Sequence, residues 1–487
     1  MINITNILNI KNSNIRIFPL QTRDHAFILF PDLMISYLFT LLIDRIWFNI
    51  NQFSIDFVFP SKKYVRNLMK NILTYEEEYF IFFLENYYHS SDFAYNFLEL
   101  ILDRISILDK KPKIIIYSLK ATSEDLLKLF TKYPFVQIAI MCDIEYFFNE
   151  LFYKKTDINN IWNIIYRNDD LVVNSNLTWK IEYDLNDYIL WAYHSKHYIN
   201  FYKSKDYISS LIDEDNEYTN KHIYYQKPKN DFILWYRYQK ENEVMLTTWR
   251  GCKYNCSYCY RWVKYSKLRQ ISLETIKKDL DYLRDNQYKY IYLYDDCFVT
   301  TNLDRMNDLT SLLSKYDFEY WISARYEVCT EENLEYLSRI NIRRIQVWLQ
   351  SVSFEVNKWT KRWFKKENFE RTFKSMYEKG IAVSLDIILW LPWEWLKGFL
   401  TTFQYAVKLQ PKSIFINSLF LNPGTDLYNK KDEYWIITND INWKKNLFHV
   451  PSIYESSNFT KLEIEFARKY VSYYIDKLKD NIYIILR

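Results

Sequence analysis

Short apolar runs and amphipathic segments alternate regularly through the second half of the chain. The apolar runs predict six strands, at Val244–Thr248, Tyr290–Tyr294, Glu319–Ala324, Arg344–Leu349, Val383–Leu389 and Ser413–Leu419. The segments between them have helical periodicity, at Leu273–Asp285, Leu303–Lys315, Glu331–Arg339, Glu367–Lys379 and Leu396–Leu409. Six units of this kind predict a partial (βα)6 barrel of the triosephosphate-isomerase type, which would carry its chemistry at the carboxyl ends of the strands.

A similar but less regular alternation precedes this block. Strand-like runs occur at Ile15–Phe18, Ile55–Phe59, Ile114–Leu119 and Val136–Met141, with helical patterns at Asp32–Ile43, Phe93–Leu108 and Ser123–Tyr133. They predict a Rossmann-like α/β domain over residues 1–155. We expect a connector over 156–240, the barrel over 241–425 and a C-terminal helical extension over 426–487, with one helix at Lys461–Leu478.

Composition narrows the class of protein. The 487 residues carry a net charge of only +4, which argues against a dedicated nucleic-acid binder. No secretory signal is visible, and the uninterrupted apolar run Leu33–Ile43 is about half as long as a membrane span. Three of the six cysteines lie within eight residues, which indicates a metal site in a reducing compartment, so we expect a cytoplasmic protein.

The three clustered cysteines are the clearest chemical signal. Cys252, Cys256 and Cys259 follow the first barrel strand with the spacing C-x3-C-x2-C. Three thiolates can each bind one iron of an iron–sulfur cube and leave the fourth iron without a protein ligand, as catalysis requires. The alternative is a zinc site completed by a distant histidine or by Cys142, although the sequence has no second C-x2-C pair.

This spacing, with the aromatic Tyr258 before the last cysteine, resembles the radical S-adenosylmethionine (SAM) superfamily over residues 243–425. The resemblance implies that the three cysteines hold a 4Fe–4S cluster whose open iron chelates SAM. One electron then cleaves SAM into methionine and a 5′-deoxyadenosyl radical.

Further residues at predicted strand ends match the superfamily's SAM-binding positions. The resemblance implies that Asp295 and Asp296 contact the methionyl ammonium, that Arg325 neutralises the carboxylate, and that Gln350 and Ser351 bind the ribose or carboxylate. For the two aspartates the alternative is an acidic residue at a helix amino end or a solvated turn, and for Arg325 it is a surface salt bridge. Two further sites extend the match, namely Leu391-Pro392, in the turn that packs on adenine, and Asn422-Pro423-Gly424-Thr425, which is similar to the family's P-G-T.

The superfamily pattern has glycine at several positions where this chain has tryptophan. The positions are Trp348, Trp363, Trp390, Trp393 and Trp435. The whole chain has 4 glycines and 16 tryptophans, whereas glycine averages about 7% of residues in proteins. Our hypothesis is that these tryptophans are recoded glycines from a lineage that reads UGA as glycine. The alternative is real substitution in a decayed paralogue.

An α/β domain before such a barrel resembles the cobalamin-binding class of the superfamily. Residues Ile161–Arg167 are similar to that class's I-x-G-I-x-Y-R stretch, and Cys142–Phe147 falls where the class has an acidic turn. The cobalt-ligating D-x-H-x-x-G motif is absent, and neither Asp24-His25 nor His89 replaces it. The fold is therefore expected, while cobalamin binding stays open.

These observations predict a radical SAM enzyme that modifies an unidentified small-molecule or peptide substrate. The reaction would be a cobalamin-dependent methylation if the first domain binds that cofactor. An electron donor such as flavodoxin or ferredoxin is an expected partner, and neither a membrane nor a nucleic acid is. The alternatives are a catalytically inactive paralogue that acts as a binding protein, and an iron–sulfur electron carrier.

Overall fold

The computed structural model divides the chain into two compact units, one built mainly from residues 1–190 and the other mainly from residues 191–419 and 453–487. The described residues are 9–19, 41–46, 52–55, 68–84, 91–119, 123–169, 171–175, 184–187, 243–259, 268–419, 424–434, 459–478 and 482–486, with a few isolated positions.

The first unit is a doubly wound α/β sheet. Its strands lie in the order β2-β1-β3-β4-β5-β6-β7. The first five of these are mutually parallel, whereas β6 and β7 continue the sheet antiparallel to β5. The strands are β1 (Ile15–Pro19), β2 (Phe53–Ile55), β3 (Tyr79–Phe83), β4 (Lys113–Tyr117), β5 (Val136–Ile140), β6 (Ile164–Asn168) and β7 (Leu171–Ser175).

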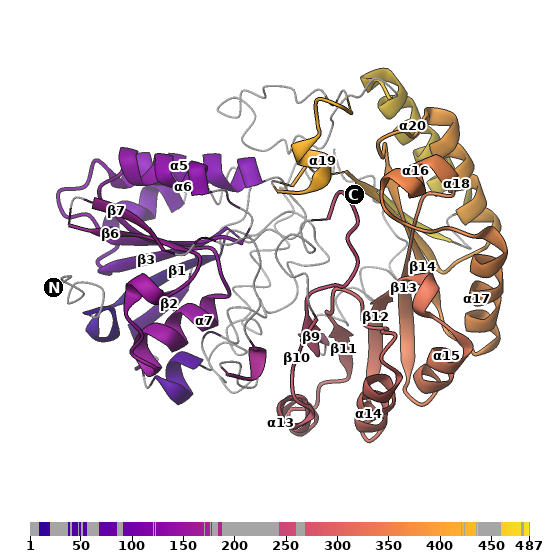
Figure 1. Ribbon diagram of the computed structural model, residues 1–487, viewed down its shortest axis with the longest axis horizontal. Coiled ribbons are helices and arrows are strands. Elements are labelled where there is room, and N and C mark those ends of the chain that lie inside the picture. Colours follow the sequence, from indigo (N-terminus) through magenta and orange to yellow (C-terminus); the bar gives the residue numbers. More distant parts are fainter. Residues whose placement is uncertain are drawn as a thin grey trace. The chain divides into compact units, whose positions relative to one another are not determined.

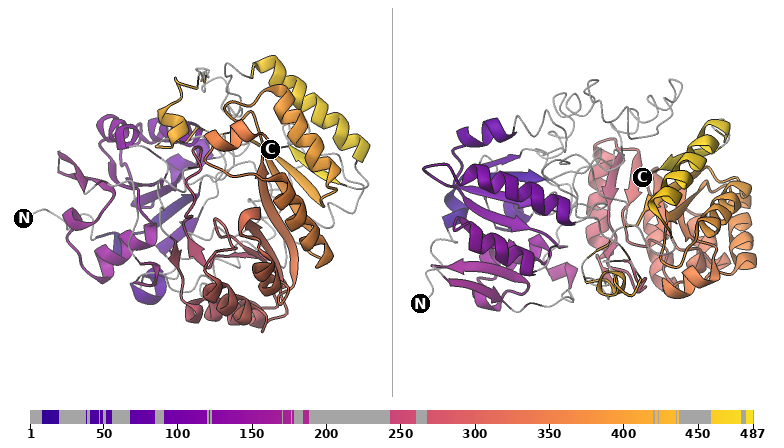
Figure 2. Two further views of the ribbon diagram at one scale, coloured as in Figure 1. Left: turned by 45° about the vertical axis from the view of Figure 1, so that its right-hand side comes forward. Right: turned by 90° about the horizontal axis from the view of Figure 1, so that it is seen from above.

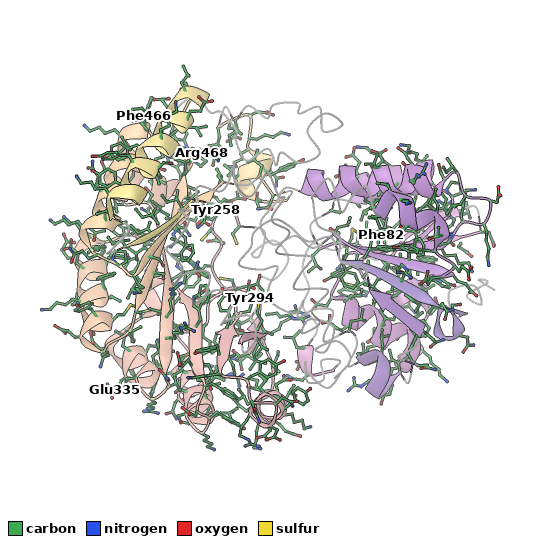
Figure 3. The ribbon with its side chains drawn as sticks, turned by 180° about the vertical axis from the view of Figure 1, so that it is seen from behind. Phe82, Tyr258, Tyr294, Glu335, Phe466 and Arg468 are labelled. Carbon is green, nitrogen blue, oxygen red and sulfur yellow. The ribbon has the colours of Figure 1, made fainter. Side chains whose placement is uncertain are left out.

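Helices cover both faces of this sheet. Figure 1 shows α5 (Ser91–Ile105) and α6 (Ser123–Lys132) on one face and α7 (Ile144–Phe148) on the other. The central strand β3 is buried along its whole length, as expected of a parallel strand packed on both sides. The core between the sheet and its helices is made of Phe, Ile and Leu side chains, including Phe82, which Figure 3 labels.

The structure adds strands to the predicted N-terminal domain. β3 was not among the predicted strands, and β6 and β7 lie where we expected a connector. Ile164 and Ile165 are fully buried, so the hairpin that they begin joins the sheet instead of bridging two domains. Most of the predicted strand Ile55–Phe59 and of the predicted helix Asp32–Ile43 lies outside the described residues, as does 191–242.

The second unit is a seven-stranded parallel sheet in the order β16-β15-β14-β13-β12-β11-β8. Its strands are β8 (Glu243–Leu246), β11 (Tyr290–Leu293), β12 (Glu319–Ala324), β13 (Ile342–Gln350), β14 (Val383–Leu389), β15 (Ser413–Ser418) and β16 (Tyr483–Leu486). The predicted α/β class and the six predicted strands are confirmed. Among the described residues the sheet has open edges at β8 and β16, as a partial barrel requires.

Side-chain caps fix the residue at which three of the helices in this unit begin. Ser272, Asn302 and Thr330 each accept a hydrogen bond from a backbone N–H in the first turn that follows. The helices are α13 (Leu273–Asp285), α14 (Leu303–Leu313), α15 (Glu331–Leu337), α17 (Lys366–Glu378), α18 (Leu396–Lys408) and α20 (Lys461–Leu478). Figure 2 shows them following one face of the sheet, with α20 beside α18.

Several short elements of this unit were not predicted, among them the two-stranded ribbon of β9 (Trp249–Arg250) and β10 (Arg269–Gln270). A short helix, α16 (Phe354–Trp359), follows β13, and the tail that we expected to be helical ends in β16. β16 pairs in parallel with β15, so α20 and β16 extend the repeating strand–helix pattern. No described helix is long and apolar enough to cross a membrane.

Candidate functional site

The cysteine loop begins where β8 ends, and two adjacent aspartates after β11 fix its first residues. Asp295 Oδ1 accepts hydrogen bonds from the backbone N–H groups of Thr248 (2.7 Å) and Trp249 (2.9 Å). Asp296 Oδ2 accepts one from the N–H of Gly251 (3.0 Å). Gly251 has a φ of +102°, which glycine adopts without strain. The chain can therefore turn sharply just before Cys252.

Asp295 differs from the prediction in what it contacts. Its side chain is buried, and besides the two N–H groups it accepts hydrogen bonds from the hydroxyls of Thr247 (3.1 Å) and Thr248 (2.9 Å). Burial raises its pKa to about 6, although these hydrogen bonds oppose the shift. Both carboxylate oxygens are thus used within the protein, which favours a role in positioning the loop over direct contact with a ligand.

The far end of the loop is held by backbone contacts. The N–H of Ser257 donates to the Thr360 carbonyl (3.3 Å), and the Ser257 carbonyl accepts from the N–H of Leu427 (2.9 Å). The N–H of Cys259 donates to the Cys256 carbonyl (3.0 Å), which closes a tight turn around Tyr258 (Figure 3). The loop is therefore fixed at both ends.

The three thiols have the chemistry that an iron–sulfur cluster needs. Cys252 is buried, and Cys256 and Cys259 are half-buried. Burial raises the pKa of Cys252, so its thiolate needs a positive partner such as iron. Among the described residues no three Cys, His, Asp or Glu side chains gather tightly enough to hold one metal ion. A cube does not need such convergence, because each thiolate binds a different iron.

Two buried arginines contact the middle cysteine. Arg325, directly after β12, places Nη1 3.7 Å from Cys256 Sγ, and Arg362 places its Nη1 3.8 Å from the same sulfur. Arg325 also pairs with Glu327 and lies over the ring of Tyr254 at 4.0 Å. Arg362 also donates to the Trp348 carbonyl of β13 (2.5 Å). Arg362 therefore connects the cysteine loop to β13.

The ends of β13 and β14 form the other side of the site. Gln350 is buried at a register shift in β13, and its Oε1 has no hydrogen-bond partner. Ser351 donates to Glu394 Oε1 (2.8 Å), and the other oxygen of Glu394 is also unpartnered. Burial raises the pKa of Glu394 to about 8. Buried acceptors without donors are what a site for a hydrogen-bonding ligand would leave.

The turn after β14 has unusual backbone geometry. Leu391 and Pro392 are buried, and the Leu391 carbonyl accepts from the N–H of Glu394 (3.0 Å). The flanking Trp390 and Trp393 have φ values of +54° and +65°. This is the left-handed region, which favours glycine and in which a bulky residue is an outlier.

The structure places the predicted site residues at the carboxyl ends of β8, β11, β12, β13 and β14. Contacts connect the cysteine loop directly to Asp295, Asp296 and Arg325. Arg362 and Glu394 were not among the predicted site residues. Glu394 sits in the recognised turn, but Arg362 follows a helix and has no strand-end signal. In the P-G-T match, Pro423 lies outside the described residues, while Thr425 caps the short helix α19 (Asp426–Asn429).

Comparisons with known proteins agree with this geometry. Residues 246–404 match the family model of the radical SAM superfamily. The heme chaperone HemW of Buchnera aphidicola subsp. Schizaphis graminum is 26% identical over 228 residues, which are 44% of this chain and 59% of HemW. The chain thus spans less than two thirds of that relative's length.

Two solved structures share the fold over most of the chain. One is TsrM from Kitasatospora setae, a radical SAM methyltransferase with cobalamin and a 4Fe–4S cluster bound, with a TM-score of 0.59 and 12% identity, covering 88% of this chain and 81% of TsrM. The other is the cobalamin-dependent radical SAM enzyme OxsB, with a TM-score of 0.61 and 16% identity, covering 95% of this chain and 67% of OxsB. At these identities the likeness concerns the fold.

The matched segment contains the whole cysteine loop and the ends of β11, β12, β13 and β14. Domains of this superfamily use a 4Fe–4S cluster and SAM, and the donor set described above fits both. Residues 246–404, about a third of the chain, thus match the radical SAM superfamily in sequence, and the site described above lies within them.

Proposed function

We propose that the protein cleaves SAM reductively and uses the 5′-deoxyadenosyl radical to take a hydrogen atom from a small-molecule or peptide substrate. Cys252, Cys256 and Cys259 would hold the cluster. When bound, the cluster would supply the one electron that breaks a carbon–sulfur bond of SAM and releases methionine. An external donor such as ferredoxin or flavodoxin would then reduce the cluster again.

The observation that supports this proposal best is the loop's attachment to the sheet. The loop leaves β8 and is held by Asp295 and Asp296, so its thiols lie at the carboxyl end of the parallel strands, where barrel enzymes carry their chemistry. The loop thereby comes next to positions that can contact a nucleoside and an amino acid.

The remaining predicted residues differ in how well their present contacts suit a role in binding SAM. Gln350 has a buried, unpartnered carbonyl oxygen that could accept from the ribose or the ammonium. Leu391 and Pro392 offer an apolar backbone turn for adenine. Arg325 already pairs with Glu327, so neutralising a carboxylate would require that pair to share or rearrange. Asp296, Ser351 and Tyr258 remain proposed contacts.

The test is SAM cleavage by the anaerobically reconstituted chain. Incubation with dithionite and SAM should release 5′-deoxyadenosine and methionine in equal amounts, measured by liquid chromatography and mass spectrometry. A matched C252A/C256A/C259A variant should bind little iron and release neither product. Only the three cysteines differ in that variant. Its circular dichroism spectrum, compared with that of the parent, therefore serves as the folding control.

Two results would select the alternatives. A W348G/W390G/W393G variant that is loaded with cluster and still releases no 5′-deoxyadenosine would contradict the enzyme proposal and favour a binding protein. Reversible one-electron reduction without any SAM-dependent change in the cluster's EPR signal would favour an electron carrier.

A second proposal concerns the first unit. Its five parallel strands have the order 2-1-3-4-5, a doubly wound order in which ligands bind at the carboxyl ends near the switch between the first and third strands. TsrM and OxsB, which share the fold, are described as cobalamin enzymes. We propose that this unit binds a corrinoid without a histidine ligand from D-x-H-x-x-G, and that the reaction is then a methyl transfer or related rearrangement.

Hydroxocobalamin binding to the whole chain tests this second proposal. After mixing and gel filtration, the corrinoid absorbance should elute with the protein at about one equivalent. Free elution of the corrinoid at saturating concentration would remove the methyltransferase reading and leave SAM cleavage untouched.

A further inference from the structure

Arg362 combines deep burial with the lack of a carboxylate partner. Arg362 is only 5% exposed, and among the described residues no Asp or Glu oxygen lies within ion-pair distance of its guanidinium. Glu327, whose charge also acts on Arg362, is paired with Arg325. Its polar contacts are the Trp348 carbonyl at 2.5 Å and Cys256 Sγ at 3.8 Å. A buried cation needs a balancing anion, and the thiolate of Cys256, once it binds a cluster, would be the nearest one among the described residues.

The position of Arg362 is fixed by the chain around it. Its backbone N–H donates to the Asn357 carbonyl (2.8 Å) at the end of α16. Two residues earlier, the Thr360 carbonyl accepts from the N–H of Ser257 in the cysteine loop (3.3 Å). The segment 360–362 therefore contacts the loop twice, once through its backbone and once through the guanidinium on Cys256.

Arg325 contacts the same sulfur but has a different charge balance. Its Nη2 lies 2.5 Å from Glu327 Oε1, which compensates much of its charge, and its guanidinium is packed on Tyr254. Arg362 thus contributes the larger net positive charge at Cys256. This asymmetry gives the two arginines different expected effects.

We propose that Arg362 is the built-in counter-ion of the cluster at Cys256 and that it sets the reduction potential, with Arg325 as a weaker second donor. The inference rests on the proposed cluster. A core held by three thiolates is anionic, and reduction adds another negative charge. Nearby positive charge and N–H donors to sulfur stabilise the reduced state more than the oxidised state, so they raise the potential.

The first test is an EPR-monitored redox titration of the reconstituted holoprotein. At the potential where the parent is half reduced, R362Q should show a reduced-to-oxidised ratio about tenfold lower, equivalent to about 59 mV for one electron. R325Q should change the ratio about threefold, and R362K, which keeps the charge, should change it less than threefold. R339Q, at an exposed arginine of another loop, is the control and should match the parent.

Equal iron and sulfide content per chain shows that the compared proteins hold the same cluster. A parent-like ratio in a fully loaded R362Q overturns the proposal, and so does a larger shift in R325Q than in R362Q. If R362Q changes the reduced-to-oxidised ratio as expected but the parent releases no 5′-deoxyadenosine, the counter-ion role is supported and the proposed reaction is contradicted.

A second test does not need a loaded cluster. In the metal-free protein the charge of Arg362 lacks its counter-ion, so apo R362Q should unfold at a higher temperature than the apo parent. Reconstitution should then raise the melting temperature of the parent more than that of any R362Q that loads. A lower melting temperature of apo R362Q relative to the apo parent would show that Arg362 is an ordinary structural arginine and overturn the proposal.

Discussion

Trp390 and Trp393 have backbone angles that set them apart from the other non-glycine residues at positive φ. Nine non-glycine residues among the described ones have a positive φ. Besides the two tryptophans they are Lys155, Asn163, Asp169, Gln287, Gln350, Lys361 and Gln410. These seven residues have either a long flexible side chain or an amide or carboxyl side chain, whereas tryptophan has the largest side chain of all. The indole N–H of Trp390 is also buried without a partner. These observations support glycine as the native residue at both positions.

The other suspected positions have weaker structural support. Trp348 lies within β13 next to its register shift and has no positive φ. Trp363 is 77% exposed, so its side chain is tolerated without strain. Trp435 lies outside the described residues. Recoding at these three positions remains a hypothesis from the sequence.

Replacing Trp393 by glycine should cost little or stabilise the fold. Left-handed backbone costs a non-glycine residue about 1–2 kcal/mol, and the 40% exposed indole loses mainly its stacking on Trp359. We expect the free energy of unfolding of W393G to lie within about 1 kcal/mol of the parent or above it. W321G is the matched control, because Trp321 sits in extended backbone of β12 and stacks on Tyr292, and it should lose about 3 kcal/mol.

Urea denaturation measures both variants. Mass spectrometry of the protein from its natural host gives the complementary result, and we expect glycine at 390 and 393. Tryptophan at both positions in the host protein, or a W393G as unstable as W321G, would contradict recoding.

Glu394 should make stability depend on pH. Its pKa rises from 4.5 to about 8 in the folded chain, chiefly through burial, so the folded state binds the proton more tightly than the unfolded state. The stabilisation is complete below about pH 4.5 and is lost as pH rises toward 8. E394Q mimics the neutral acid, so the parent should lose stability relative to E394Q over this window, by up to about 1.4 kcal/mol per pH unit.

Urea denaturation of both proteins at several pH values between 4.5 and 8 checks this. E335Q, at an exposed glutamate of α15, should follow the parent. A constant difference between E394Q and the parent across the window would show that Glu394 is not protonated in the folded chain.

At the scale of elements, Asp295 connects two neighbouring strand ends. Its carboxylate accepts hydrogen bonds from two backbone N–H groups and two hydroxyls after β8. D295N would place an amide N–H among these donors and leave buried groups unsatisfied, at about 1–3 kcal/mol each. We therefore expect D295N to lose at least about 2 kcal/mol of unfolding free energy and to bind less iron after reconstitution.

The exposed D304N in the first turn of α14 is the control for this prediction and should keep the parent's iron content. Iron analysis and urea denaturation report the two effects separately. A D295N chain with full iron content and parent-like stability would show that Asp295 is dispensable for loop position.

The sequence could predict the elements whose signals are local. β12 and β14 begin and end at the predicted residues, because both are mainly apolar runs between segments of helical periodicity. β16 was missed because its partner β15 lies about 70 residues away in the chain, and only that pairing distinguishes it from a frayed tail. The three cysteines were identified from spacing alone. Arg362 was not, because its role depends on the fold of α16 rather than on a motif.

At the scale of the whole molecule, the described residues form two seven-stranded sheets, one in each compact unit. A ligand stabilises the unit that binds it, by about 2.7 kcal/mol at a concentration one hundred times its Kd. The cluster and SAM should therefore raise the unfolding temperature of the unit that contains β8 and β11–β16. Hydroxocobalamin, if the proposal for the first unit is right, should raise that of the unit that contains β1–β7.

Hydrogen–deuterium exchange on the full chain can assign these effects, because peptides from 113–140 report on the first sheet and peptides from 319–350 on the second. We expect added hydroxocobalamin to slow exchange in 113–140, and cluster reconstitution to slow it in 319–350. C252A/C256A/C259A should remove the second effect and keep the first. Slower exchange in 319–350 alone, under both additions, would mean that the corrinoid acts through the cluster unit and that the first sheet does not bind it.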